Sequence, residues 1–295
     1  MDKYKRIRTV SRGVHGTVFL CSIEDRDGGD DRSPEKPSSD SSDSSPKTTK
    51  QVILKEISLN SIQANERKPA LIEANVLSRL NHPFIVRYNE SLQSPTSLVL
   101  VMEYLEGGNM AEFLASRDEK LLPECDVLRF FSQLVLGLSH IHGQNILHRD
   151  LKTQNIFMDK FHRTAKIGDF GISKVLESQS KAQSVVGTPS YISPELCEGK
   201  PYNHKSDIWS LGCVLYEMLT LHRAFEAPTL TALVLKILRG RVAPVPQSYS
   251  EALRNLLLDL LHLEPDRRPS VNSLLASAPL LVTLDKIRLQ MPGYT

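Results

Sequence analysis

Side chains that could take part in catalysis are concentrated in two short segments, HRDLKTQN at residues 148–155 and GDFG at residues 168–171. Their types suit phosphoryl transfer, a reaction that depends on positioning and on neutralising phosphate oxygens more than on covalent chemistry from the protein. Asp150 could accept the proton of an incoming hydroxyl group. Asn155 and Asp169 offer oxygen atoms, the ligands that Mg²⁺ prefers, so we expect both to bind magnesium.

Lys152 supports this interpretation because it lies two positions after Asp150 and could neutralise the phosphate during transfer. Either tripeptide, His-Arg-Asp or Asp-Phe-Gly, is also compatible with an ordinary loop when it occurs alone. The presence of both in this order, with Lys152 and Asn155 at these spacings, favours a site for phosphoryl transfer over an ordinary loop.

An upstream lysine and glutamate are predicted to form an ion pair. Lys55 lies in VILK, within a β-rich run that starts at Gln51, and Glu73 lies in a helix that we expect to begin near Pro69. Helical spacing places Glu73 on the inward face of that helix, together with Val76, Leu77 and Leu80. Two charges at apolar positions cost several kcal/mol unless they satisfy each other. A pair that holds Lys55 against nucleotide phosphates is therefore favoured over a surface salt bridge.

The order of the expected elements predicts an α+β fold in two parts, because strands come first and helices follow. We expect a small β-rich N-terminal lobe with one long helix over residues 1–102, a larger helical C-terminal lobe over 103–282, and a tail over 283–295. Residues 25–50 contain no hydrophobic side chain that could offset the entropy of ordering them. This segment is predicted to be a disordered surface insertion without a catalytic role.

Composition excludes several classes of protein. The 295 residues are 40% hydrophobic and carry a formal net charge of +2, so no strong field favours nucleic acid or an anionic membrane as a partner. The four cysteines are widely spaced, as is typical of reduced thiols. No apolar run reaches the roughly 18 residues that cross a bilayer. We expect a cytoplasmic protein that binds no nucleic acid and does not insert into membranes.

The motif set as a whole resembles the protein kinases from about Tyr4 to about Leu280. Within that superfamily, KIGDFGISK and GTPSYISPELCEGKPYNHKSDIWSLGCVLYEML resemble the NIMA-related kinases, especially the subgroup with C-terminal propeller-type repeats, which are absent here. The resemblance implies a bilobal serine/threonine protein kinase that uses ATP and Mg²⁺ and acts on serine and threonine residues of protein substrates. A location at the cilium, the centrosome or the cytoskeleton is implied by the subgroup alone.

The resemblance also implies which residues meet the adenine base. Glu103 and Leu105 would contact it through the backbone, and Met102 would be the gatekeeper side chain. Ile53 stands where many kinases have alanine, which enlarges a side chain that lines the adenine pocket. Asn109 stands where an acidic contact to the ribose is common.

The glycine loop departs from the kinase pattern G-x-G-x-x-G-x-V. It consists of Ser11, Arg12, Gly13, Val14, His15, Gly16, Thr17 and Val18, so serine replaces the first glycine and His15 replaces an aromatic residue. Gly13 and Gly16 still allow backbone amides to approach phosphates closely. We expect the serine to weaken nucleotide affinity at most.

Further expectations concern regulation of the site and its structural support. By the kinase resemblance, Ser184 would be the activating phosphorylation site, with Arg149 as the partner of the phosphate, and Thr188 would order the acceptor site. Glu195 and Arg268 would form a structural ion pair. Asp207, near the start of a predicted helix, should hydrogen-bond to the catalytic loop, cap its own helix, or both.

Two alternatives to an active serine/threonine kinase follow from the sequence. Ser11 is compatible with a catalytically weak scaffold or binding module that keeps the kinase fold. Tyrosine specificity is a second alternative, and it conflicts with Lys152 and Thr188. The presence of the lysine, the two aspartates and the asparagine favours an active enzyme.

Overall fold

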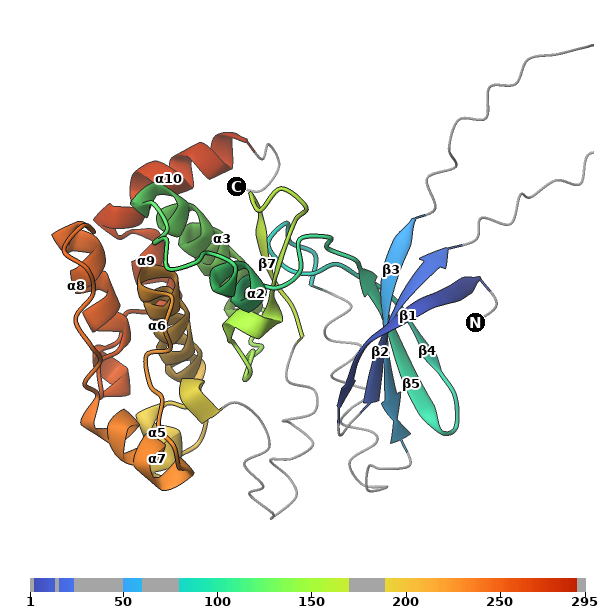
Figure 1. Cartoon of the computed structure of the whole chain (residues 1–295), viewed down its shortest axis with the longest axis horizontal. Coiled ribbons are helices and arrows are strands. Elements are labelled where there is room, and N and C mark those ends of the chain that lie inside the picture. Colours follow the sequence, from blue (N-terminus) through green and yellow to red (C-terminus); the bar gives the residue numbers. More distant parts are fainter. Residues whose placement is uncertain (1–2, 14–15, 24–49, 60–79, 170–188, 291–295) are drawn as a thin grey trace, which may run out of the picture. The chain divides into compact units, whose positions relative to one another are not determined.

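The computed structural model describes residues 3–13, 16–23, 50–59, 80–169 and 189–290 (Figure 1). Several expectations lie outside the described residues: the insertion up to residue 49, the helix from Pro69 with Glu73, the loop positions Val14 and His15, and the positions Ser184 and Thr188.

The chain forms two compact units. Unit 1 combines Met1–Ala74 with Tyr88–Tyr104, and unit 2 combines Asn75–Arg87 with Leu105–Thr295. The sequence-based division kept all residues before 103 together, whereas 75–87 belongs to unit 2. The reason is backbone pairing: Val86 N donates to Ile167 O at 2.8 Å, and Ile167 N donates to Phe84 O at 2.8 Å.

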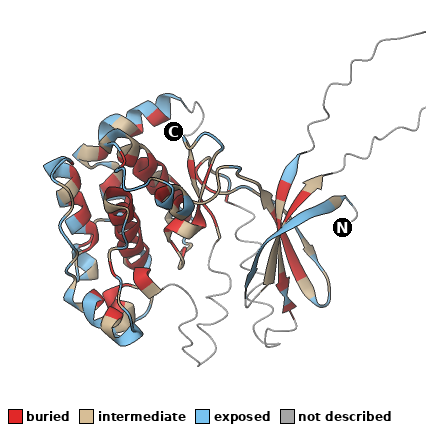
Figure 2. Cartoon of the chain, in the orientation of Figure 1, coloured by how far each residue is buried: buried red, intermediate tan, exposed pale blue. Residues whose placement is uncertain are grey.

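Unit 1 contains an antiparallel sheet in the order β1-β2-β3-β5-β4. Its strands are β1 (Tyr4–Gly13), β2 (Gly16–Ile23), β3 (Gln51–Ser58), β4 (Tyr88–Gln93) and β5 (Ser97–Glu103). Apolar residues alternate along the strands, so one face carries a buried core of Cys21, Val52, Leu54, Val99 and Val101. This core appears as buried segments of the sheet in Figure 2.

The two ends of the insertion are adjacent in the sheet of unit 1. β2 and β3 are antiparallel, with Ser22 opposite Gln51. Ile23 N donates a hydrogen bond to Lys50 O at 2.9 Å. The insertion therefore connects two strand ends that already pair with each other.

Replacing residues 25–49 by an Asn-Gly turn is expected to raise the free energy of unfolding by about 1–2 kcal/mol, because a shorter loop costs less entropy to close. Urea unfolding of the shortened and the full chain measures the difference. A lower unfolding free energy in the shortened chain would show that the insertion makes stabilising contacts.

Unit 2 is largely helical, with one small two-stranded sheet, β6-β7. Its elements are α2 (Met110–Ala115), α3 (Glu124–Gly143), η2 (Thr153–Asn155), β6 (Ile156–Met158), β7 (Ala165–Ile167), η3 (Pro189–Tyr191), α5 (Pro194–Cys197), α6 (His204–Thr220), α7 (Leu230–Arg239), α8 (Glu251–Leu260), η4 (Pro265–Arg267), α9 (Val271–Leu275) and α10 (Ala278–Leu289). No helix in these described ranges is both long enough and apolar enough to cross a membrane.

Helix α6 is the buried centre of unit 2 (Figure 2). Every residue from Ser206 to Leu219 is buried, so the helix contacts protein on all sides. The Asn203 side chain accepts a hydrogen bond from Lys205 N at 2.8 Å, and Ser206 Oγ accepts one from Asn203 N. This capping arrangement starts the helix at His204, slightly before the predicted start.

Helix α10 crosses the predicted start of the C-terminal tail at residue 283. Leu280, Leu284 and Ile287 are buried and follow helical spacing on either side of that position. Packing of this face continues the helix to Leu289, so residues 283–289 are part of unit 2 and not of a tail.

A half-buried histidine, His82, is expected to make the stability of unit 2 sensitive to acid. His82 Nδ1 accepts a hydrogen bond from Phe84 N at 3.2 Å. The His82 ring stacks on His140 with 5.2 Å between the ring centroids. Burial, and then the neighbouring His140, lowers the pKa of His82 from 6.5 to about 4. His82 is therefore neutral in the folded protein at neutral pH.

The protein is expected to lose stability as the pH falls from 6.5 towards about 4, because the unfolded state binds a proton at His82 more tightly than the folded state does. His82→Asn keeps a hydrogen-bond acceptor but does not titrate. Urea unfolding at about pH 7 and about pH 5 should show a smaller pH effect in this variant. An equal pH effect in both proteins would contradict this role of His82.

Candidate active site

Two of the predicted site residues, Lys152 and Asn155, converge on the carboxylate of a third, Asp150, in unit 2. Lys152 Nζ lies 2.8 Å from Asp150 Oδ2. Asn155 Nδ2 donates to the same oxygen at 2.9 Å and to the backbone oxygen of Asp150 at 2.8 Å. The side chains of Asp150 and Lys152 are 18% and 17% exposed, so solvent and ligands can reach the pair. The arrangement fixes the direction of the carboxylate.

The backbone connects this carboxylate to the segment that contains Asp169. Gly168 N donates to Asn155 O at 2.9 Å. Asp169 itself has φ +50°, a left-handed conformation that costs a non-glycine residue on the order of 1 kcal/mol. The fold therefore holds Asp169 in an unfavourable backbone conformation next to the hydrogen-bonded Asn155 segment.

His148 links the two catalytic segments through its imidazole ring. Its Nδ1 accepts from Asp150 N at 3.3 Å, so the ring proton is on Nε2, which donates to Gly168 O at 3.1 Å. The ring is fully buried. Burial lowers the pKa of His148, which keeps the ring neutral in this arrangement.

Asp207 of α6 fixes the backbone at the start of the catalytic loop. Its Oδ2 accepts from His148 N at 3.0 Å and from His142 Nε2 at 2.8 Å. Its Oδ1 accepts from Arg149 N at 3.1 Å and from Tyr202 OH at 2.5 Å. Burial alone would raise the pKa of Asp207, but the hydrogen bonds from His142 and Tyr202 and the proximity of the His148 ring outweigh it and lower the pKa.

The hydrogen bonds to Asp207 restrain the backbone at Arg149, which has φ +66°. A left-handed arginine persists only when its surroundings hold it there. The hydrogen bond from Arg149 N to Asp207 supplies such a restraint. Asp207 thus positions the backbone of His148 and Arg149.

A second buried network connects the catalytic loop to α6 and η3, and the sequence analysis missed it. Thr153 Oγ1 donates to Glu217 Oε2 at 2.9 Å and lies 2.9 Å from Tyr191 OH. Tyr191 OH in turn donates towards Gln154 Oε1 at 3.4 Å. Burial raises the pKa of Glu217. The available signal was a carboxylate within the apolar pattern of a helix, the same signal that singled out Glu73.

Replacing Thr153 by Val is expected to lower the free energy of unfolding by about 1–3 kcal/mol, because Glu217 loses a donor while its carboxylate stays buried. Thr153→Ser keeps the hydroxyl and serves as the control. Urea unfolding at neutral pH measures both variants. If the valine and serine variants are equally stable, the hydrogen bond to Glu217 contributes nothing to the free energy of unfolding.

The expected structural ion pair is present and buried. Arg268 Nη2 lies 2.8 Å from Glu195 Oε2, and Nη1 donates to Oε1 at 2.9 Å. Ser206 Oγ donates to Oε1 of the same carboxylate at 2.7 Å. Arg268 also donates to three backbone carbonyl oxygens, those of Lys205, His262 and Leu263. The pair joins α5 to η4 and the start of α6.

Unit 1 contains several of the described residues of the predicted nucleotide site. Lys55 on β3 lies opposite Val18 on β2 and Leu100 on β5. Ile53 lies opposite Met102. A side chain at Gly16 would place its Cβ 2.0 Å from Glu56 O, so only glycine fits this position in β2. The strand register therefore gathers these residues by backbone pairing.

The remaining residues that were predicted to contact the nucleotide belong to both units. Ser11, Arg12 and Gly13 are exposed residues of β1, and Glu103 ends β5. Leu105 belongs to unit 2. Asn109 is the N-terminal cap of α2, where its Oδ1 accepts from Glu112 N at 3.0 Å. A structural role as helix cap thus accounts for Asn109.

The protein kinase domain model matches residues 43–278. The chain is 49% identical over 278 residues to serine/threonine-protein kinase Nek8 of Danio rerio, covering 94% of this chain and 37% of that protein. It is 40% identical over 289 residues to serine/threonine-protein kinase nekl-2 of Caenorhabditis elegans, covering 96% of this chain and 75% of that protein. The chain thus spans only a part of the length of Nek8.

Among solved structures, the crystal structure of Rad53 1-466 in complex with AMP-PNP is similar. The TM-score is 0.75 at 26% sequence identity, and the match covers 94% of this chain and 65% of that chain.

Proposed function

Because the chain belongs to the protein kinase family, and within it to the NIMA-related kinases, we propose that it transfers the γ-phosphoryl group of ATP to serine and threonine hydroxyl groups of proteins. The observation that carries the proposal is the convergence of Lys152 and Asn155 on the Asp150 carboxylate. A non-specific serine/threonine protein kinase is the enzyme class that these residues suit.

Asp150 acts in this proposal as the acceptor of the hydroxyl proton. Hydrogen bonds from Asn155 and the nearby Lys152 ammonium hold its carboxylate in one direction. The Lys152 ammonium, which reaches Asp150 from the same loop, is close enough to neutralise charge on the phosphate as the hydroxyl attacks. Both groups are partly exposed, as a site that receives a protein side chain requires.

The donor set in unit 2 fits magnesium. The amide nitrogen of Asn155 is engaged with Asp150, so its Oδ1 is the atom left to ligate a cation. The Asp169 carboxylate would be the second ligand, and oxygen ligands are those that Mg²⁺ prefers. When bound, the ion neutralises charge on the phosphates of ATP.

Unit 1 would supply most of the contacts to ATP itself, and Leu105 of unit 2 would add one. Lys55 would hold the α- and β-phosphates, paired with Glu73, and the backbone at Gly13 and Gly16 would approach the phosphates. Glu103 and Leu105 would meet the adenine base through their backbone, with Met102 and Ile53 lining the pocket. Similarity to a kinase crystallised with AMP-PNP supports nucleotide binding.

Phosphorylation of the segment before η3 would regulate the enzyme. Ser184 is the proposed site, and Arg149 would pair with its phosphate by charge-assisted hydrogen bonds. Thr188 would order the acceptor site. The left-handed backbone that Asp207 maintains at Arg149 supports the positioning of its guanidinium.

Mass spectrometry of the purified chain before and after incubation with Mg-ATP and casein tests the proposal. We expect new phosphate on serine and threonine of casein, and on Ser184 of the chain. A Ser184→Asp variant provides the activated state if the isolated chain starts unphosphorylated. Absence of transfer in both proteins would favour a kinase-fold scaffold, the alternative that Ser11 in the glycine loop allows.

A further inference from the structure

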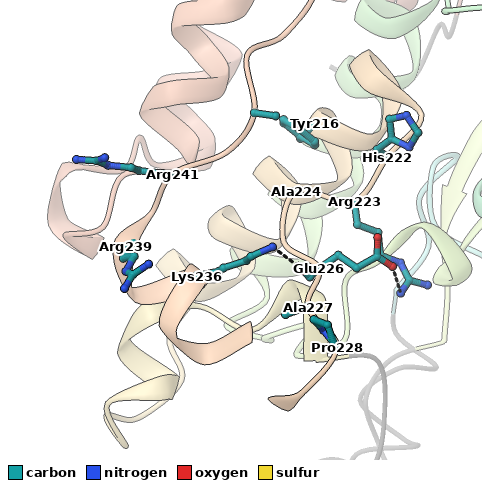
Figure 3. A pocket seen from close by; sticks show the side chains of 11 residues that line it. Tyr216, His222, Arg223, Ala224, Glu226, Ala227, Pro228, Lys236, Arg239 and Arg241 are labelled. Carbon is teal, nitrogen blue, oxygen red and sulfur yellow. Dashed lines mark hydrogen bonds and ion pairs between the residues drawn. The ribbon is translucent and has the colours of Figure 1, made fainter. Parts of the chain in front are cut away.

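Unit 2 contains a pocket of about 1260 Å³ that the catalytic residues do not line. It lies beside α7, between the end of α6 and the chain that follows α7 (Figure 3). Its lining includes four basic side chains: Arg223, Lys236, Arg239 and Arg241. A single carboxylate, that of Glu226, lies among them. The chain as a whole carries only +2, so this excess of positive charge is local.

The basic side chains of the pocket are poorly neutralised. The Glu226 side chain is 74% exposed and lies 3.9 Å from Arg223 Nη1, a separation at which an ion pair contributes little. Lys236 Nζ instead donates to the backbone oxygen of Glu226 at 2.7 Å, which fixes the position of the ammonium group (Figure 3). Within the ranges that the structure describes, Arg239 and Arg241 form no ion pair.

Stabilisation of helix α7 explains the presence of only some of these basic side chains. Lys236 and Arg239 lie in the last turn of α7, where cations interact favourably with the helix dipole. Arg223 and Arg241 lie outside the helix, so the dipole does not account for them. An anionic ligand would be stabilised by both groups of side chains.

The size and lining of the pocket indicate a peptide. Its volume exceeds the roughly 300–1,000 Å³ of pockets that hold small molecules. Tyr216, Ala227, Pro228 and Ala243 add apolar surface beside the cations. A free phosphate ion would leave this surface uncovered, whereas a peptide segment could cover it and place one anionic group among the basic side chains.

We propose that this pocket binds a phosphorylated segment of a partner protein, with the phosphate held by Lys236, Arg239 and Arg241. A phosphate dianion matches several cations better than one carboxylate does, and arginine donates to phosphate oxygens in a bidentate manner. The site recruits a protein that is already phosphorylated. Binding requires neither ATP nor catalysis, so it stands independently of the proposed kinase activity.

Fluorescence anisotropy with the full chain tests the proposal. The probes are fluorescein-labelled degenerate peptide pools with phosphoserine, serine or glutamate fixed at the central position. The phosphoserine pool should bind at least about tenfold more tightly than the serine pool, since hydrogen bonds between charged groups are lost with the phosphate. The glutamate pool should fall between them. Equal binding of the phosphoserine and serine pools would overturn the proposal.

The Arg239→Gln, Arg241→Gln double variant should lose that preference. Lys286→Gln with Arg288→Gln is the matched control, because it removes the same charge from exposed positions near the end of α10. Thermal unfolding checks that both variants fold. If both double variants lose the preference for phosphoserine equally, the preference depends on overall charge and the proposed site is refuted. If a single-stranded oligonucleotide at equal concentration displaces the peptide, the pocket binds nucleic acid and the proposal is refuted.

Discussion

Asp150→Asn is expected to lower kcat for phosphate transfer by about 10²–10⁴-fold, because the amide cannot accept the proton of the attacking hydroxyl group. The change is nearly isosteric, and an amide oxygen can still accept the hydrogen bond that Asn155 donates. The loop should therefore keep its conformation. Steady-state kinetics with casein measures kcat, and fluorescence titration with a labelled ATP analogue measures nucleotide binding, which we expect to change little.

Asp285→Asn is the matched control for this substitution. Asp285 lies on α10 with its side chain 69% exposed. The Asp285→Asn substitution should therefore leave kcat unchanged. Near-normal turnover in Asp150→Asn would show that another group accepts the proton. A parallel loss of nucleotide affinity would instead indicate that the loop has rearranged.

Arg268→Ala is expected to lower the free energy of unfolding by about 3–5 kcal/mol, because it leaves the carboxylate of Glu195 buried without its cation. Glu195 is 3% exposed as a side chain and keeps only Ser206 as a side-chain donor. The substitution also removes the guanidinium that lies 5.1 Å from the Trp209 ring centroid. Urea unfolding at neutral pH measures the loss.

The neighbouring arginine provides a sharp control. Arg267 also forms an ion pair, with Glu264 at 2.8 Å, but both side chains are 66% exposed. Arg267→Ala should cost less than about 1 kcal/mol, since exposed ion pairs contribute little. Similar losses at Arg267 and Arg268 would contradict the importance of burial. Glu195→Gln combined with Arg268→Met should recover part of the stability that Arg268→Ala loses.

The pH dependence of this pair has a defined sign. Burial alone would raise the pKa of Glu195, but the hydrogen bonds from Arg268 and Ser206 outweigh it and lower the pKa below 4.5. The pair therefore stabilises the fold above about pH 4.5, and this contribution is lost as the pH falls further. Arg268→Ala should show a weaker dependence of stability on pH in that acidic range.

The amino-acid sequence by itself identified the residues that act within a few positions of each other. Asp150, Lys152 and Asn155 lie in one eight-residue segment, so their types and spacing already limit how they can meet. The β-rich run from Gln51 likewise predicted β3, and the helix expected near Asp207 is α6. These signals are local, because they depend on the repeat of a strand or a helix.

Contacts between distant segments were decided by the tertiary structure. No spacing indicates that Thr153 meets Glu217 and Tyr191, or that His142 shares Asp207 with the catalytic loop. The pairing of residues 84–86 with Ile167 and the continuation of α10 past residue 283 also depend on partners far along the chain.

The physical reason is that a side chain is buried, ionised or hydrogen-bonded according to all the elements that surround it. The basic pocket beside α7 shows this most clearly, because its cations come from a loop, a helix and the chain after that helix. In the sequence they are ordinary surface charges in a nearly neutral protein. Only the folded chain places them around one cavity.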